Sequence, residues 1–253
     1  MPPVERRLVD TTACWRVVPA VESLGFGTEF GALAKSSNGD SADFLFAFVG
    51  RRVLQVGHFP PGPVREPCIL AGLSKTAKGS ITILGQDARA ENTRRSIGVL
   101  GHGIGVYEEL SAFENLRLFA KLYGIADPQK KAGEWLERTG LERVRDGLVR
   151  EFSRGMRQRL AVARTFLHNP SLLLLDEPFT ALDDRAIAVL QDLLKTARNE
   201  GRTIIMSTHQ LREALELATD VALINRGKLA FSGPRTGEML EDPAWLYRNY
   251  GEA

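Results

Sequence analysis

Two adjacent carboxylates, Asp176 and Glu177, follow an unbroken apolar run in the segment SLLLLDEPFTALDD (residues 171–184). Such a run is typical of a strand buried on both faces, and ligands bind at the carboxyl ends of strands in open α/β sheets. There Asp176 can hold Mg²⁺, directly or through water, and Glu177 can polarise an attacking water as general base. An acidic pair alone is more often a solvated turn, but the four leucines before it and PFTALDD after it favour a functional site.

Two other segments carry residues that suit phosphate chemistry. FSRGMRQRLAVAR places Ser153 and Gly155 at the start of a predicted helix, where free N–H groups and the helix dipole attract anions. A glycine there also lets backbone approach a phosphate closely. His209 follows a buried strand in TIIMSTHQLREA, and one helix–strand unit brings it beside Glu177. Taken singly, the first segment is more often an ordinary Ser-capped helix, and a lone histidine in the second is more often structural than catalytic.

The elements that must position these residues alternate between helices and buried strands after Ile69. Ser111 and Glu114 form a predicted capping box, with Gly124 as the C-cap. Helices are predicted at residues 111–124, 129–140, 153–167, 183–201 and 210–218, and strands at 79–87, 171–176, 202–208, 220–224 and 228–233. This alternation predicts an α/β domain with a mostly parallel sheet. Before Ile69 only residues 44–49 and 53–56 read as strands.

The composition is that of an ordinary globular protein. The chain has 253 residues, a formal net charge of +2, an apolar fraction of 43% and a charged fraction of 25%, which fit one large domain or two small ones. Its two cysteines, Cys14 and Cys68, form no metal-type cluster and indicate a reducing compartment. No apolar run reaches the ~18 residues that span a bilayer, so a membrane role requires docking onto another subunit.

Together these motifs resemble the ATP-binding subunits of ABC transporters over residues 69 to about 233. FSRGM stands where that family has its LSGGQ signature and matches it at Ser153 and Gly155, while LLLLDE resembles the Walker B strand with Glu177 as the catalytic glutamate. TALD, ending at Asp183, resembles the D-loop, and STH carries the switch histidine, His209. The resemblance implies a P-loop NTPase-like fold that binds ATP with Mg²⁺, with Asp176 on the metal and a small helical subdomain at about residues 105–160.

One position departs from the family pattern within this region. His102 stands in the Q-loop segment IGVLGHGIGVYEEL, where the family has a glutamine that touches Mg²⁺ and the attacking water. By its position we assign His102 to the nucleotide-binding residues. A similar LGH, together with DEPFTALD, occurs in the haem-exporter branch that serves cytochrome c maturation.

The phosphate loop of the family, GxxxxGK[ST], is not matched in chemistry. Counting back from Leu70 places its two glycines at Gly57 and Gly62, with VLQV as the preceding strand. Pro63 then replaces the lysine and Val64 the Mg²⁺-binding hydroxyl. The loop works through consecutive backbone N–H groups that cradle phosphates, and each proline in GHFPPGP removes one.

Three explanations account for the poor match of residues 1–68. The segment is a degenerate nucleotide site, or it is translated from the wrong reading frame, or another chain supplies the phosphate loop. The abrupt onset of family character at Ile69 favours the frame explanation. The domains are therefore predicted as residues 1–68, an ATPase core at 69–233 and a C-terminal tail at 234–253.

The resemblance implies an exporter subunit at the cytoplasmic face of the cell membrane. Its partners would be transmembrane permease subunits and a second ATP-binding subunit, identical or different, with no nucleic acid. One alternative is a catalytically inactive regulatory partner whose signature completes the site of an active paralogue. Another is a soluble ABC ATPase of DNA repair or translation, which is disfavoured because only about fifty residues separate His102 from Ser153 and the chain carries one such domain.

Overall fold

The computed structural model describes residues 15–16, 44–49, 54–56, 81–84, 86–87, 89–101, 105–225 and 228–250. The predicted loop glycines Gly57 and Gly62, with Pro63 and Val64, lie outside the described residues, and so does His102.

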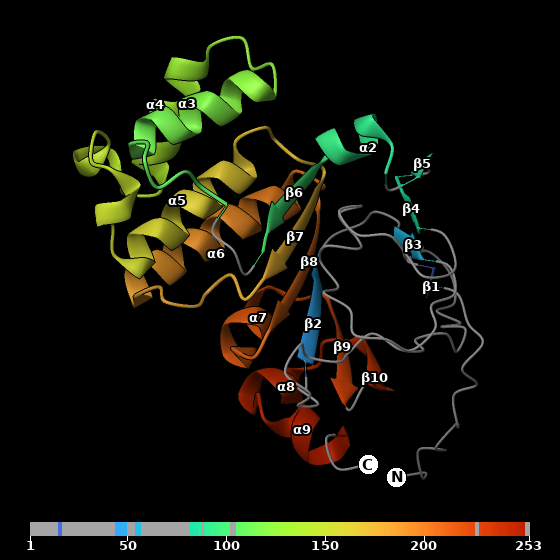
Figure 1. The fold of residues 1–253 in the computed structure, drawn as a ribbon. Coiled ribbons are helices and arrows are strands. Elements are labelled where there is room, and N and C mark those ends of the chain that lie inside the picture. Colours follow the sequence, from blue (N-terminus) through green and yellow to red (C-terminus); the bar gives the residue numbers. More distant parts are fainter. Residues whose placement is uncertain are drawn as a thin grey trace.

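A six-stranded sheet in the order β10–β9–β2–β8–β7–β6 forms the centre of the molecule (Figure 1). Its strands are β2 (Phe44–Val49), β6 (Ile97–Leu100), β7 (Leu172–Asp176), β8 (Thr203–Thr208), β9 (Asp220–Asn225) and β10 (Lys228–Pro234). Strands β6, β7 and β8 pair in parallel. Because β2 is antiparallel to both β8 and β9, strand β9 runs in the direction of β8, and only β2 and β10 oppose the other four. The predicted α/β fold with a mostly parallel sheet is confirmed.

The two N-terminal strands predicted from the sequence lie in different sheets. The continuous apolar strand β2 is paired along both edges within the main sheet, as its composition favours. Strand β3 (Leu54–Val56) instead pairs with β1 (Trp15–Arg16) and β4 (Ile81–Ile83), and β4 with β5 (Gln86–Asp87), in a separate antiparallel sheet. The strand predicted at residues 53–56 is thus present at residues 54–56, whereas the phosphate loop expected after it lies outside the described residues.

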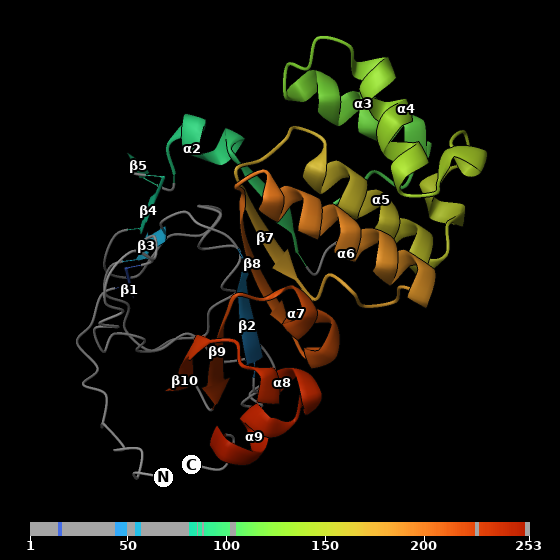
Figure 2. The ribbon, with the colours of Figure 1, turned by 180° about the vertical axis from the view of Figure 1, so that it is seen from behind.

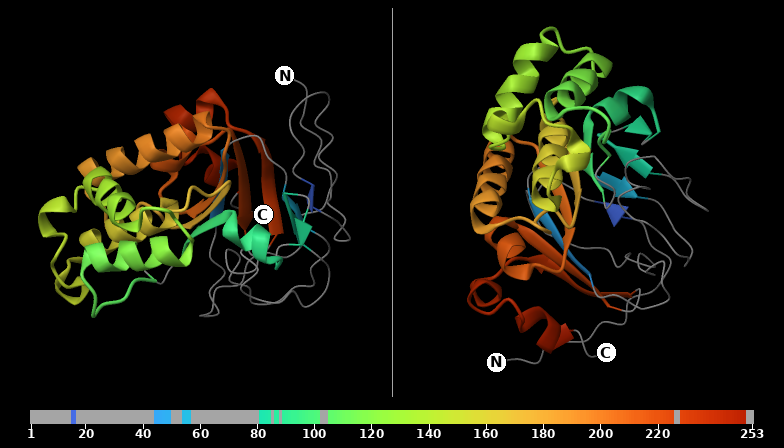
Figure 3. Two further views of the ribbon diagram at one scale, coloured as in Figure 1. Left: turned by 90° about the horizontal axis from the view of Figure 1, so that it is seen from above. Right: turned by 60° about the vertical axis from the view of Figure 1, so that its left-hand side comes forward.

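Helices cover one face of the main sheet, and the small antiparallel sheet lies on the other side (Figures 2 and 3). The helices that follow the parallel strands are α5 (Arg154–Phe166), α6 (Asp184–Asn199) and α7 (Leu211–Leu217), and α8 (Gly237–Glu241) and α9 (Trp245–Tyr250) follow β10. On α6 the side chains of Leu190, Leu194 and Ala197 share one face at helical spacing and are buried. Residues 172–175 of β7 are at most 2% exposed, so this strand is buried on both faces as predicted.

A group of helices between β6 and β7 packs beside the sheet, at the upper left of Figure 1. It contains α3 (Ala112–Leu122), α4 (Pro128–Arg138) and the short 3₁₀ helices η1 (Glu142–Val144) and η2 (Val149–Glu151), while α2 (Glu91–Arg95) precedes β6. The capping box is present: Ser111 Oγ accepts from the N–H of Glu114, whose carboxylate accepts from the N–H of Ser111. Gly124 follows α3 with φ of +71°, a left-handed conformation that favours glycine.

No helix within the described ranges is both long enough and apolar enough to cross a membrane.

Candidate functional site

The carboxylate of Asp176 lies at the end of β7, as predicted. Asp176 pairs with Ser207 of β8, and its Oδ1 accepts a hydrogen bond of 2.7 Å from the Ser207 hydroxyl. The site thus offers hard oxygen atoms, which Mg²⁺ prefers. The described residues contain no group of three metal-type side chains.

Glu177 adopts a strained backbone conformation and is held in it from the neighbouring strand. Its φ is +48°, which is uncommon for a residue with a Cβ. The Glu177 N–H donates to the carbonyl of Ser207 at 2.8 Å. Its carboxylate accepts from Thr208 Oγ1 at 3.1 Å, from the N–H of His209 at 3.1 Å and from His209 Nδ1 at 2.7 Å. Strain that is fixed by surrounding bonds is typical of functional sites.

The hydrogen bond to Glu177 fixes the orientation of the His209 ring. Because an ionised carboxylate only accepts hydrogen bonds, Nδ1 must carry the proton in this pair. The side chain of Glu177 is 11% exposed and that of His209 is 68% exposed. Because Nδ1 contacts Glu177, the Nε2 atom on the other side of the ring faces away from this carboxylate. The structure brings Asp176, Glu177 and His209 together through neighbouring strands, as the sequence predicted for the last two.

The signature segment begins α5 and contacts the loop that follows β7. Ser153 caps this helix, since its Oγ accepts from the N–H of Met156 at 3.2 Å. A Cβ on Gly155 would lie 2.9 Å from the carbonyl oxygen of Ala181. Within this chain the glycine is thus required by the close approach of α5 to the TALD loop. The phosphate contact expected for Gly155 remains a prediction.

The loop after β7 is anchored at several points. Phe179, a residue of this loop, has a fully buried side chain. Gln158 of α5 donates its side-chain N–H to the carbonyl of Pro178 at 3.1 Å. At the end of the loop, the Asp183 carboxylate accepts from the N–H of Ala186 at 2.8 Å and caps α6. The sequence analysis missed Gln158, although its position one turn after Gly155 in the signature helix was a usable signal.

A second missed residue is Arg164, which connects α5 to both sides of the segment that contains His102. Its Nη2 donates to the carbonyl of Val99 at 3.0 Å and its Nη1 to that of Gly105 at 2.5 Å. Its guanidinium also lies 5.2 Å from the ring centre of Phe119. Burial lowers the pKa of Arg164 from its usual value. This arginine ties the signature helix to the end of β6 and to α3.

The fold and this arrangement define a nucleotide-binding domain of the P-loop NTPase type, with a helical group inserted between two parallel strands. A family model described as "ABC transporter" matches residues 68–180. The match begins one residue before Ile69, where the sequence changes character.

Similar proteins support the same assignment. NatA, an ABC transporter ATP-binding protein of Bacillus subtilis, is 33% identical over 170 residues, which are 65% of this chain and 69% of that protein. The Nod factor export ATP-binding protein I of Cupriavidus metallidurans is 34% identical over 169 residues, 65% of this chain and 56% of its own. The daunorubicin/doxorubicin resistance protein DrrA of Streptomyces peucetius is 35% identical over 175 residues, 68% and 53% of the two chains.

A solved ATP-binding subunit of an ABC transporter aligns with a TM-score of 0.62 at 28% identity, covering 74% of this chain and 77% of that structure. The chain belongs to the family of ABC transporter ATP-binding proteins. Its matches span only about half the length of the Nod factor and daunorubicin relatives. The names of these relatives refer to Nod factor export and to daunorubicin/doxorubicin resistance, so the narrower haem-exporter assignment stays a prediction.

Proposed function

We propose that this chain is the ATP-binding subunit of an ABC-type exporter, coupling ATP binding and hydrolysis to transport through permease subunits at the cytoplasmic membrane face. One observation carries the proposal: the Glu177 carboxylate is fixed between Thr208 and His209, directly after Asp176 at the end of a buried parallel strand. The ATP-binding class is shared with NatA and DrrA, and the export role is favoured by the printed function of the Nod factor relatives.

Each residue of this group has a distinct proposed role. Bound Mg-ATP would supply the electrophilic phosphorus and the metal's charge, and Asp176 would hold the metal side of the nucleotide. Glu177 would orient and polarise the attacking water. His209, whose Nε2 faces away from Glu177, would contact the terminal phosphate. The hydrogen bond between His209 and Glu177 would hold the two side chains in a fixed position relative to each other.

The signature residues would act on the site of a second ATP-binding subunit. Ser153 and Gly155 begin a 13-residue helix, and the N-terminus of such a helix favours a phosphate. Asp183 and His102 would complete the nucleotide contacts around the two sites. Because the signature residues would contact ATP in the site of the partner, their role would remain even if this chain's own site binds ATP weakly.

The chain's own phosphate contacts are impaired in this proposal. Pro63 and Val64 replace the lysine and hydroxyl of the phosphate loop. Each charge-assisted hydrogen bond that is lost is worth roughly 1.5–3 kcal/mol. A micromolar ATP affinity amounts to about 8 kcal/mol in total, so a few such losses remove most of it. A heterodimer with an intact paralogue is the arrangement in which this chain would still support transport.

The test is the variant Glu177→Gln in the assembled transporter. If Glu177 is the general base, ATP turnover falls by at least 100-fold in any assembly in which this subunit's site turns over, within the range that general-base catalysis contributes. Asp192→Asn, an exposed carboxylate on α6, serves as the matched control and should leave turnover unchanged. Unchanged turnover in Glu177→Gln, measured per assembled complex, would instead favour the inactive regulatory partner.

A further inference from the structure

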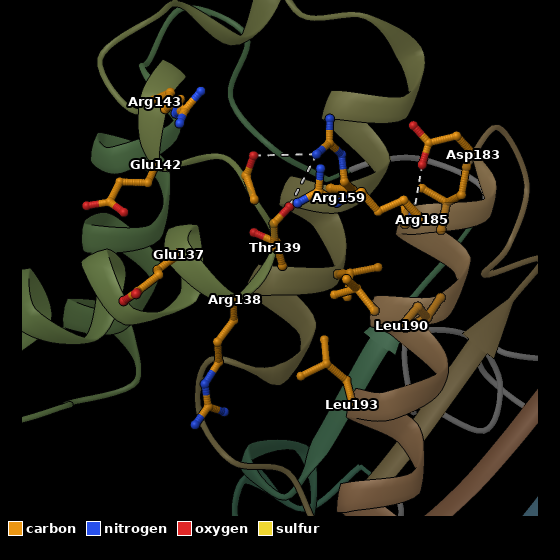
Figure 4. A pocket seen from close by; sticks show the side chains of 15 residues that line it. Glu137, Arg138, Thr139, Glu142, Arg143, Arg159, Asp183, Arg185, Leu190 and Leu193 are labelled. Carbon is orange, nitrogen blue, oxygen red and sulfur yellow. Dashed lines mark hydrogen bonds between the residues drawn. The ribbon is translucent and has the colours of Figure 1, made fainter.

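A hollow of about 560 Å³ lies away from Asp176, Glu177 and His209 (Figure 4). It is bounded by the end of α4 and η1 on one side, by α5, and by the first half of α6 on the other. Its volume lies within the range of small-molecule sites, roughly 300–1,000 Å³. Of the predicted site residues only Asp183 reaches its wall, so the hollow is a feature separate from the proposed ATP site.

The inner wall of the hollow is apolar. It is formed by one residue of α5, one residue of the TALD loop and three residues of α6, namely Val162, Leu182, Val189, Leu190 and Leu193. Val162 and Leu190 are buried at 3% and 2% exposure, whereas the others are partly exposed. A hydrocarbon group placed here would contact α5 and α6 at once.

The outer wall carries four arginines, Arg138, Arg143, Arg159 and Arg185. In Figure 4 the side chain of Arg185 reaches from α6 toward Arg159 on α5. Among the residues that the structure describes, Nη1 of Arg159 makes only long hydrogen bonds, 3.4 and 3.5 Å, to the carbonyls of Thr139 and Gly140. Among the described residues, none of the four arginines forms an ion pair.

None of the acidic residues of the wall forms an ion pair with these arginines among the described residues. Figure 4 shows the carboxylates of Glu137 and Glu142 pointing away from Arg159 and Arg185. Asp183 is engaged in capping α6. Two guanidinium groups that converge without a carboxylate between them repel each other, and an anion between them relieves that repulsion.

We propose that this hollow binds a small amphiphile with an anionic head and a hydrocarbon body. A carboxylate or phosphate head would lie between Arg159 and Arg185, because guanidinium groups bind both in a bidentate manner. The hydrocarbon body would lie on Val189, Leu190 and Leu193. Since the ligand would touch both α4–η1 and α6, its binding stabilises the packing of these two parts of the fold. The proposal does not depend on ATPase activity.

The experiment titrates the full chain with decanoate and with decyl phosphate below their micelle concentrations, using calorimetry and thermal unfolding. Both probes should bind with one site per chain and raise the melting temperature, and the tighter of the two identifies the preferred head group. Decanol and decyltrimethylammonium test the need for an anionic head, and both should bind at least tenfold more weakly. Inorganic phosphate alone tests the need for the apolar body and should also bind at least tenfold more weakly.

Matched variants localise the site. Arg185→Gln removes a charge that has no ion-pair partner among the described residues, so folding should be unaffected while decanoate affinity falls by roughly tenfold or more. Arg212→Gln on α7, outside the hollow, is the control and should bind decanoate as the unaltered chain does. The proposal is overturned by equal binding of decanol, by phosphate binding as tightly as decanoate, by an equal loss in Arg212→Gln, or by no binding of either anionic probe.

Discussion

Replacing Arg164 by methionine tests whether the signature helix is tied to the end of β6 as the structure shows. The methionine keeps most of the length and apolar stem but removes the guanidinium. The hydrogen bonds to the carbonyls of Val99 and Gly105 are then lost, together with the contact to the ring of Phe119. The carbonyl of Gly105 loses a charged donor, whereas that of Val99 keeps the hydroxyl of Thr165 at 3.2 Å.

The expected magnitude follows from these contacts. Two hydrogen bonds to a charged group contribute roughly 3–6 kcal/mol. Burial of the charged guanidinium costs free energy, as the lowered pKa of Arg164 shows, and so reduces the net contribution of these hydrogen bonds. The hydroxyl of Thr165 still donates to the carbonyl of Val99 and limits the cost of the substitution there. We expect Arg164→Met to lower the free energy of unfolding by about 3 kcal/mol. For a chain of this size that corresponds to a fall in melting temperature of roughly 6–12 °C.

Urea unfolding followed by circular dichroism measures this difference. Arg164→Lys should lie between the methionine variant and the unaltered chain, because lysine keeps the charge but lacks the two-pronged geometry. Arg212→Met, which removes an arginine of α7 that forms no ion pair among the described residues, is the control. If Arg164→Met changes the free energy of unfolding by less than about 0.5 kcal/mol, as an ordinary surface substitution does, the proposed tie does not contribute to stability.

Three further predictions address other contacts. Gly155→Ala places a Cβ 2.9 Å from the carbonyl of Ala181, so backbone must shift and stability should fall by about 1–3 kcal/mol in urea unfolding; an unchanged midpoint would contradict the close approach. Arg154→Glu keeps α5 folded, since an acidic first turn suits the helix dipole, but should lower nucleotide trapping at the partner's site at least tenfold; a loss confined to this chain's own site would exclude the trans role. Burial lowers the pKa of His168 to about 4, and its Nδ1 has no hydrogen-bond partner among the described residues. Burial of the neutral ring therefore contributes fully to the free energy of unfolding above about pH 6.5, and this contribution falls by about 3 kcal/mol toward pH 4. His168→Phe should make the free energy of unfolding less dependent on pH over this range. An equal pH dependence in both proteins would refute the prediction.

The sequence was sufficient to predict most helices and strands after Ile69, because these have strong local signals. Strand β6 was not predicted, and the single strand expected at residues 79–87 is two paired strands, β4 and β5. The apolar run of β7 and the Ser111–Glu114 capping box are encoded within a few residues, and both are present in the structure. The proximity of Glu177 and His209 was also predictable, since consecutive parallel strands place their carboxyl ends at one edge.

Contacts between distant segments could not be predicted in this way. The approach of Gly155 to Ala181 depends on how α5 packs against the following loop, which no local pattern contains. The same holds for the bonds of Arg164 to Val99 and Gly105. The pairing of β3 with β1 and β4, apart from the main sheet that contains β2, likewise joins segments that are distant in the chain.

In the proposed function, residues from Ile69 onward carry the catalytic and signature residues of an ABC ATP-binding subunit, whereas the phosphate contacts of the chain's own site are impaired. Isothermal titration with Mg-ATP tests it directly, using the unaltered chain beside a chimera in which residues 1–68 are replaced by the corresponding segment of NatA. The account predicts a dissociation constant of about 1 mM or weaker for the unaltered chain, and micromolar binding for the chimera. Micromolar binding by the unaltered chain, or no binding by a folded chimera, would contradict it.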